Sequence, residues 1–392
     1  MAVQNPNLLN LMLAYSASHR ARLLSHPEPA NRIAIWVRDV FPSLRQTLDD
    51  VSNTSVSNAN LATAIMLASL EIISPSSFGV SIPWQNHLSI ARSIIRSRGG
   101  PHSISRKDPV MFFLTRWMAY LDVMGSLSGR RNEEPLFAGN YWSSSHEGDM
   151  SSKELSLDDE DIDEDEDDYT IDCLLGFTTK CVSILAQVAL LAREVEPQRY
   201  NAETGKINEQ WRPDPGVEKR ADKLMRDLDD ARQHEARECA HHSPHLAKAK
   251  LVQHNEYPER RYSYVQMTDK DAEESVSSNS AFHYAGLVHL LRRVHNLPRS
   301  DYRVQNAVHE IVKILSTIRE GGSAEACLLF PMITAGMEAE GDLDRAEITR
   351  RIKGAEGLGM CQVSRARRVM EEVWATGQSW EEMGAVQGEF FG

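Results

Sequence analysis

Residues 328–339 read LLFPMITAGMEA, and this stretch decides the fold that we expect for the chain. It is almost uncharged, yet it contains Pro331, Gly336 and a single acid, Glu338. Proline lacks a backbone N–H and therefore starts or kinks a helix, and glycine lets a second backbone approach closely. We therefore expect a buried, bent helix at the centre of a domain. The stretch offers no nucleophile–base pair and no glycine run for a phosphate, so it is not expected to be a catalytic loop.

Apolar residues recur at helical spacing along most of the remaining chain. The pattern is present at residues 304–318, just before the stretch, and at residues 8–16, 33–41, 61–72 and 84–95. Turn residues separate these runs, and the alternating pattern of β-strands is nearly absent. The sequence therefore predicts an all-α fold, a multi-helix array without a strict repeat period.

Residues 129–169 interrupt the helical pattern. They are rich in Ser, Asn, Gly and acidic residues and cannot bury enough apolar surface to offset the entropy lost on ordering. We therefore predict a disordered acidic insertion. It divides one helical domain into an N-terminal half, residues 1–128, and a C-terminal half, residues 170–392.

The C-terminal half contains both helical and polar segments. Helical patterning resumes at residues 171–191, and residues 281–374 are densely helical. Between these, residues 234–279 are expected to be mostly loop, with one amphipathic piece at residues 246–252. The tail, residues 378–392, carries a tryptophan and two phenylalanines and is expected to dock onto the body.

Composition narrows the classes of function. The chain has 392 residues, of which 41% are hydrophobic, so it can bury a sizeable core. Its formal net charge is −13, and residues 158–168, which are acidic at every position except Ile162, supply most of the excess. A chain with this acidic balance is not expected to bind nucleic acid through its bulk surface.

The cysteines and the apolar runs indicate a soluble intracellular protein. The five cysteines are scattered and form no CxxC pair: Cys173, Cys181, Cys239, Cys327 and Cys361. This distribution is typical of core thiols in a reducing compartment rather than of disulfides or a zinc cluster. No stretch approaches the roughly 18 apolar residues of a membrane helix. The N-terminus has no basic region before its apolar run, so no signal peptide is predicted.

Two clusters could bind metal ions. Cys239, His241, His242 and His245 have short spacings like those of zinc ligands. They lack a second ligand pair and lie in polar sequence, so a surface histidine patch is the preferred interpretation. The acidic run lacks the glycine and the ligand alternation of a calcium loop. Hydrolase, metalloprotease and nucleotide-loop motifs are absent, so we predict no enzyme, no metal and no cofactor.

Isolated titratable residues are assigned structural roles. Three histidines fall within helical patterns, and five arginines lie at expected helix ends: His87, His283 and His289, and Arg92, Arg96, Arg98, Arg292 and Arg293. Histidines in such patterns are expected to be packed or to cap a helix. Cations at a helix C-terminus interact favourably with the helix dipole, so these arginines do not predict a nucleic-acid surface.

A series of weak motifs follows one order along residues 8–392. The positions that carry them are Glu71 in a small-residue helix; Trp84, His87, Arg98, Gly99 and Gly100 in a WxxHL…RGG pattern; Asp122 in the next helix; Gly176 and Phe177 in LGF; Phe330, Pro331, Gly336 and Glu338 in LFP…AGxEA; and Trp374 in a closing VW. In this order and spacing they resemble the fungal-specific regulatory domain that follows the binuclear zinc cluster in fungal transcription factors.

This resemblance implies a nuclear, non-enzymatic role in transcription regulation. The partners it implies are the transcription machinery or a DNA-binding regulator, and it leaves room for a homodimer and for a small-molecule effector in a helical cleft. The six clustered cysteines of the family's zinc module are absent from these residues, so direct DNA binding is not expected. The alternative is a helical scaffold protein that binds a partner regulator or a small ligand. A six-cysteine reading frame immediately upstream would favour the first interpretation.

Overall fold

Helices make up most of the chain in the computed structural model, which describes residues 2–49, 58–75, 82–104, 108–128, 168–172, 175–201, 203–237, 269–383 and 389–392. In these residues there is no β-strand, only isolated bridges such as Thr170 with Arg237. The all-α prediction is therefore confirmed. The predicted insertion lies outside the described residues except for Asp168 and Tyr169, as do residues 238–268.

The helices of the N-terminal half are α1 (Pro6–Leu23), α2 (Ala30–Val37), α3 (Val40–Asp49), α4 (Asn58–Ile73), α5 (Trp84–Ser97) and α6 (Pro109–Ser128), with 3-10 turns η1 (Ala2–Gln4) and η2 (Pro101–Ser103). Those of the C-terminal half are α8 (Thr179–Arg199), α9 (Pro215–Gln233), α11 (Asp269–His289) with its π-helical continuation η4 (Leu290–Val294), α12 (Tyr302–Thr317), α13 (Ser323–Cys327), α14 (Leu329–Glu338), α15 (Asp342–Glu356), α16 (Cys361–Thr376) and the 3-10 turn η5 (Trp380–Glu382).

Helix α14 is the central helix that the opening stretch predicts. All ten of its residues are buried, and it contacts α6, α11, α12, α15 and α16. Pro331 lies in the first turn, where its missing N–H would have no partner within the helix. The predicted bend within the helix is therefore wrong: the chain turns at Leu328, between α13 and α14, and the proline helps to start the helix.

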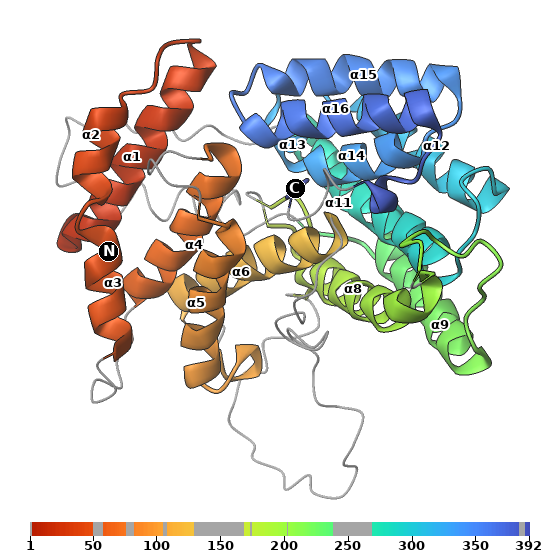
Figure 1. Ribbon diagram of the computed structural model, residues 1–392, viewed down its shortest axis with the longest axis horizontal. Coiled ribbons are helices and arrows are strands. Elements are labelled where there is room, and N and C mark those ends of the chain that lie inside the picture. Colours follow the sequence, from red (N-terminus) through yellow and green to blue (C-terminus); the bar gives the residue numbers. More distant parts are fainter. Residues whose placement is uncertain are drawn as a thin grey trace, which may run out of the picture.

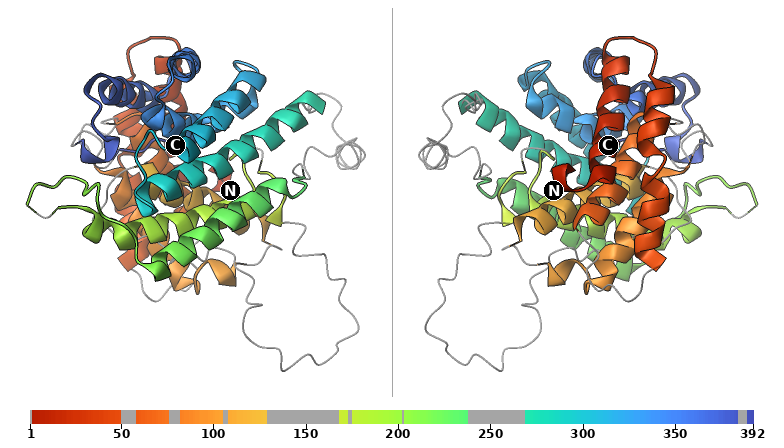
Figure 2. Two further views of the ribbon diagram at one scale, coloured as in Figure 1. Left: turned by 90° about the vertical axis from the view of Figure 1, so that its right-hand side faces the viewer. Right: turned by 90° about the vertical axis from the view of Figure 1, so that its left-hand side faces the viewer.

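One hydrophobic core connects the two halves of the chain. It runs from Leu8 in α1 to Phe391 at the C-terminus and includes Trp84 and Phe330, with Trp117 packed against it. In Figure 1, α1 to α3 flank α4 to α6 on one side, while α15 and α16 lie across α14. Figure 2 shows α9 and α11 side by side, and these helices are in contact. The boundaries of the halves stay a prediction.

Two local predictions in the C-terminal half are wrong, and one helix was not predicted. Residues 171, 172 and 175–178 form a turn and isolated bridges, and α8 begins only at Thr179, where Thr178 caps it by accepting from the Cys181 N–H at 3.1 Å. Helix α9 was not predicted, although Asp214 caps it and Pro215 fills its first position. Residues 269–279 are helical although polar, because their buried side chains have hydrogen-bond partners in other segments: Glu274 accepts from Arg319 Nε at 2.7 Å, and Asn279 Oδ1 accepts from the Thr178 N–H at 3.0 Å.

The C-terminal tail docks onto the body as predicted. Trp380, Phe390 and Phe391 are buried, with exposed fractions of 5%, 3% and 3%. The ring of Phe390 packs edge-on against Trp84 at 5.4 Å, and the N–H of Phe391 donates to the Ser128 hydroxyl at 3.1 Å. Residues far apart in sequence thus close the core together.

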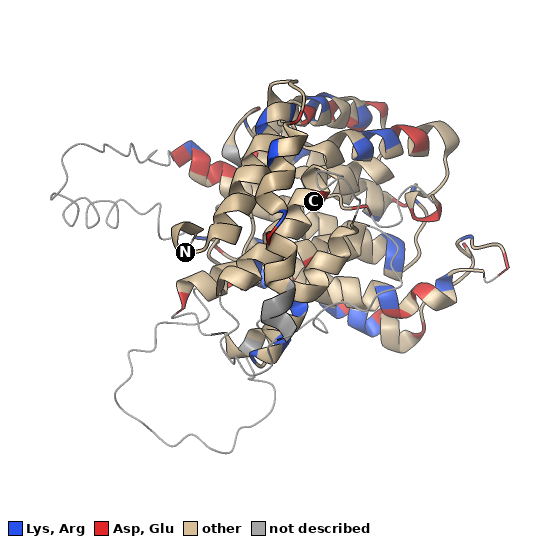
Figure 3. Cartoon of the chain, turned by 60° about the vertical axis from the view of Figure 1, so that its left-hand side comes forward, with Lys and Arg blue, Asp and Glu red and all other residues tan. Residues whose placement is uncertain are grey.

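Charged residues of both signs alternate along the outer helices in Figure 3. Of the helices in the described part of the chain, none has both the length and the apolar composition of a membrane span. Cys181, Cys327 and Cys361 are free thiols there, whereas Cys173 and Cys239 lie outside the described residues. The predicted histidine patch at residues 241–245 lies outside them as well.

Candidate functional site

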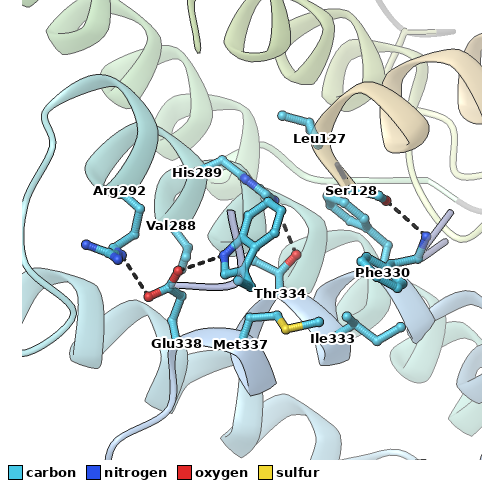
Figure 4. Close-up of a pocket in the computed structure, with 12 residues that line it drawn as sticks. Leu127, Ser128, Val288, His289, Arg292, Phe330, Ile333, Thr334, Met337 and Glu338 are labelled. Atoms are coloured by element: carbon cyan, nitrogen blue, oxygen red, sulfur yellow. Dashed lines mark hydrogen bonds and ion pairs between the residues drawn. The ribbon is translucent and has the colours of Figure 1, made fainter. Parts of the chain in front are cut away.

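Glu338, the last residue of α14, holds the centre of a buried ionic network. Its Oε2 accepts from Arg292 Nε at 2.7 Å, and its Oε1 accepts from Trp380 Nε1 at 2.9 Å (Figure 4). Arg299 Nε lies 3.5 Å from the same Oε2. A buried carboxylate costs several kcal/mol unless its charge is paired and its lone pairs are hydrogen-bonded, and these three partners do both.

A second buried carboxylate, Glu381 in η5, ties the tail to α8. Arg199 donates to it through Nη1 at 2.6 Å and Nη2 at 2.7 Å, and Arg293 Nε lies 3.6 Å away. Burial alone would raise the pKa of Glu381, but the charges and hydrogen bonds of Arg199, with Arg293, outweigh it and lower the pKa to about 2. Glu381 is therefore ionised near neutral pH and fixes the tail in place.

A small cavity lies between α6, α11, α14 and the tail (Figure 4). Its volume of about 20 Å³ is enough for roughly one water molecule and too small for an organic ligand. His289 lines it, with Nε2 3.3 Å from Thr334 Oγ1 and its ring 5.6 Å from that of Phe330. Burial lowers the pKa of His289 to about 3, so the ring is a poor general base near neutral pH.

A larger open cleft of about 1020 Å³ shares Arg292 with this cavity. It is formed by the segment between α8 and α9, the turn before α12, the start of α15 and the residues from Trp374 to Glu382. Its charged lining residues are Arg199, Lys206, Arg212, Arg292, Arg299 and Arg345, and Glu209, Glu340 and Glu382. Organic ligands bind in protein pockets of roughly 300–1,000 Å³, so this cleft is the candidate binding site of the described chain.

A family model described as a fungal-specific transcription factor domain matches residues 1–385. The chain belongs to that family. Its role therefore lies in transcription regulation, and domains of this family typically regulate rather than catalyse. No curated protein and no solved structure matches the chain significantly.

Four of the seven family-signature residues of the N-terminal half lie in its core. Glu71, Trp84, His87 and Asp122 are all buried, with 5% of each exposed or less. Asp122 accepts from Arg92 Nη2 at 2.7 Å, so the helix-end role predicted for Arg92 is wrong: it forms a buried ion pair. These positions join α4, α5 and α6 and lie outside the cleft.

The Arg98-Gly99-Gly100 run ends α5. Gly99 and Gly100 have φ values of +91° and +87°, which favour glycine, and the Gly100 N–H donates to Ile95 O at 3.0 Å. Arg98 Nη1 donates to Asn58 Oδ1 at 2.9 Å and so ties this turn to the start of α4.

The remaining signature residues surround α14. Gly176 has a φ of +80° and lies against Cys327, and the buried Phe177 ring packs at 4.7 Å from that of Phe282. At the other end of α14, Trp374 Nε1 donates to the Gly336 carbonyl at 2.8 Å. Of the fourteen signature positions, Trp374 lines the cleft, and Phe330 and Glu338 line the small cavity.

Sequence reasoning missed most of the cleft and of the ionic network. Arg292 and Arg293 were assigned to a helix end, but both take part in buried ion pairs. Arg199 and Glu381 are 182 positions apart, so no local pattern could have paired them. The available signal was weak: charged residues, including Glu338, interrupt segments that are otherwise apolar.

Proposed function

We propose that this chain regulates transcription as the helical regulatory domain of a zinc-cluster-type regulator, in the nucleus and through protein partners. The observation that carries the proposal is the family match over residues 1–385. It is supported by the single hydrophobic core of the described residues, which connects α1 to the C-terminal tail. The proposed partners of this unit are the transcription machinery or a DNA-binding regulator, in a homodimer or a heterodimer.

The proposal assigns sequence-specific DNA reading to a partner or to another segment. These residues carry five cysteines rather than the six of a zinc module, and a net charge of −13. Arg92, Arg199, Arg292 and Arg293 are held in buried or half-buried ion pairs and are not free to neutralise phosphates.

A tethering assay tests the regulatory role. The 392-residue chain is fused to an unrelated DNA-binding domain in a fungal cell, and expression of a reporter carrying that domain's site is measured. We expect a change, in either direction, relative to the DNA-binding domain alone at equal protein level. An unchanged reporter would instead support the alternative, a helical scaffold protein that binds a partner regulator or a small ligand.

A fluorescence anisotropy titration tests DNA binding by the purified chain at physiological salt. We expect only weak, sequence-independent binding, in the non-specific range of roughly 10⁻⁴ to 10⁻⁶ M or weaker. Sequence-dependent binding tighter than about 1 μM would show that these residues have a DNA-reading surface of their own.

A further inference from the structure

The charged side chains that line the large cleft are mostly cationic, although the chain as a whole is acidic. Six cationic side chains and three carboxylates line it. The buried carboxylates Glu338 and Glu381 hold Arg292 and Arg199. Lys206, Arg212 and Arg345, by contrast, make no ion pair with a described residue. Three cations therefore line the cleft without an anionic partner among the described residues.

Arg345 is held in place without being neutralised. Its Nε donates to the Ala339 carbonyl at 2.9 Å, and its guanidinium lies over the Trp374 ring at 5.4 Å from the centroid. A carbonyl and an indole face orient a guanidinium but supply no full negative charge. The planar fork of Arg345 is thus oriented beforehand, which suits bidentate binding of a carboxylate or phosphate.

Two buried polar atoms of the cleft lining make no hydrogen bond to a described residue. They are Nε of Arg299 and the hydroxyl of Ser379. Arg299 does have partial partners: its Nε lies 3.5 Å from Glu338, and its Nη2 donates to Gln378 O at 3.3 Å. Leaving a buried polar atom without a hydrogen bond costs roughly 1–3 kcal/mol, so each of these atoms needs an explanation, and a bound group beside the cleft provides one.

The cations come from segments that are far apart in the sequence. Lys206 and Arg212 belong to the segment between α8 and α9, which projects from the body in Figure 2. Arg299 precedes α12, and Arg345 lies in the first turns of α15. A ligand that neutralises cations on both sets of segments needs more than one anionic group. Glu209, Glu340 and Glu382 would repel a long polyanion such as nucleic acid, so a compact ligand fits better.

We propose that this cleft binds a small organic molecule with at least two carboxylate or phosphate groups. Arg345 and Arg299 hold one anionic group, and Lys206 and Arg212 hold another. The residues from Trp374 to Glu382 form one wall, so the ligand also contacts the segment that Glu338 and Glu381 fasten to the body. That the ligand is an effector of transcription rests on the proposed function; that it binds does not.

Isothermal titration calorimetry of the purified 392-residue chain tests the proposal. The probes are citrate, for polycarboxylates, and inorganic pyrophosphate, for phosphates, each against sodium chloride at equal ionic strength. We expect at least one probe to bind with a Kd of about 1 mM or tighter, a threshold set by the few charge-assisted hydrogen bonds available. The probe that binds identifies the anionic group. Failure of both probes at 10 mM, or equal heats from chloride, would overturn the proposal.

Variants locate the binding. Arg345→Gln is expected to weaken it at least tenfold, and Lys206→Gln, at an exposed position that should not disturb folding, at least threefold. The matched control is Arg350→Gln, on the same helix but paired with Glu347 and outside the cleft, which should keep the Kd within twofold. Unchanged affinity in Arg345→Gln and Lys206→Gln would place the ligand elsewhere and contradict the assignment. Binding together with a silent tethering assay would refute only the regulatory role.

Discussion

Gly336→Ala provides a quantitative test of how α14 packs in the core. Gly336 lies within α14 and has an ordinary helical backbone, so alanine fits its conformation. A Cβ there would overlap Met370 Sδ and would lie 3.1 Å from Met370 Cε and 3.3 Å from Ile348 Cγ2. Met370 and Ile348 are both fully buried, so neither can move into solvent. Gly336 thus brings α14 close to α15 and α16.

The expected magnitude follows from two opposing terms. Alanine in place of glycine within a helix stabilises by about 0.8–1 kcal/mol. Adding a methyl group to a filled core costs about 1–3 kcal/mol. Gly336→Ala should therefore lower the free energy of unfolding by about 0–2 kcal/mol in total.

Gly354→Ala is the matched control for this change. Gly354 lies within α15, and a Cβ added there meets nothing within 4 Å. It should stabilise by up to about 1 kcal/mol, because only the propensity term applies. The difference between the two variants removes that shared term and isolates the packing cost, about 1–3 kcal/mol.

Urea unfolding followed by circular dichroism measures both variants, with the slope m compared to ensure that ΔG values refer to the same transition. If Gly336→Ala is as stable as Gly354→Ala, the close packing of α14 is refuted. A double-mutant cycle tests whether Met370 causes this packing cost. In a Met370→Ala background, the loss of stability caused by Gly336→Ala should largely disappear. A cost that persists there would mean that Met370 is not the obstacle.

Three further changes test the buried polar groups and the turn before α8. Glu381→Gln should lower the unfolding free energy by about 3–5 kcal/mol in a urea melt, because it leaves buried arginines unpaired. Glu347→Gln, which breaks an exposed pair, should cost at most about 1 kcal/mol, and equal losses would contradict the ionic network. His289 has its pKa lowered to about 3, so the unfolded state takes up its proton first as pH falls below about 6.5 and stability is lost. His289→Gln should therefore remove about 1.4 kcal/mol of the stability lost between pH 7.5 and 5.5, and an unchanged difference would mean that the ring is not buried and neutral. Gly176→Ala should destabilise by more than about 1 kcal/mol, since it combines a φ of +80° with overlap on Cys327, and a neutral result in a thermal melt would refute that turn.

The sequence predicted those features that depend on local order along the chain. Apolar spacing of 3–4 residues identified α1, α4, α5, α12 and α16, although α4 is buried on nearly all sides and α1 buries Leu11 and Ala14 rather than Met12 and Leu13. The aromatic residues of the tail indicated docking, since leaving Trp380 and Phe391 in water would be unfavourable. The family also followed from sequence, because ordered weak motifs over residues 8–392 are a one-dimensional signal, and the family model over residues 1–385 confirms it.

Tertiary structure decided the partners of buried charges and the existence of the cleft. Arg199 meets Glu381 across 182 positions, and Arg292 meets Glu338 across 46, so no local pattern indicated either pairing, although Glu338 stood out as the single acid of an apolar segment. Arg345 lines the same cleft as Lys206 and Arg299, and the Ala339 carbonyl and the Trp374 ring orient its side chain. Local periodicity depends on the next one or two turns of the chain, whereas a binding site depends on which distant segments the core brings together. The sequence by itself therefore determined most of the helices and the family, and packing alone determined which charges are neutralised and which face the cleft.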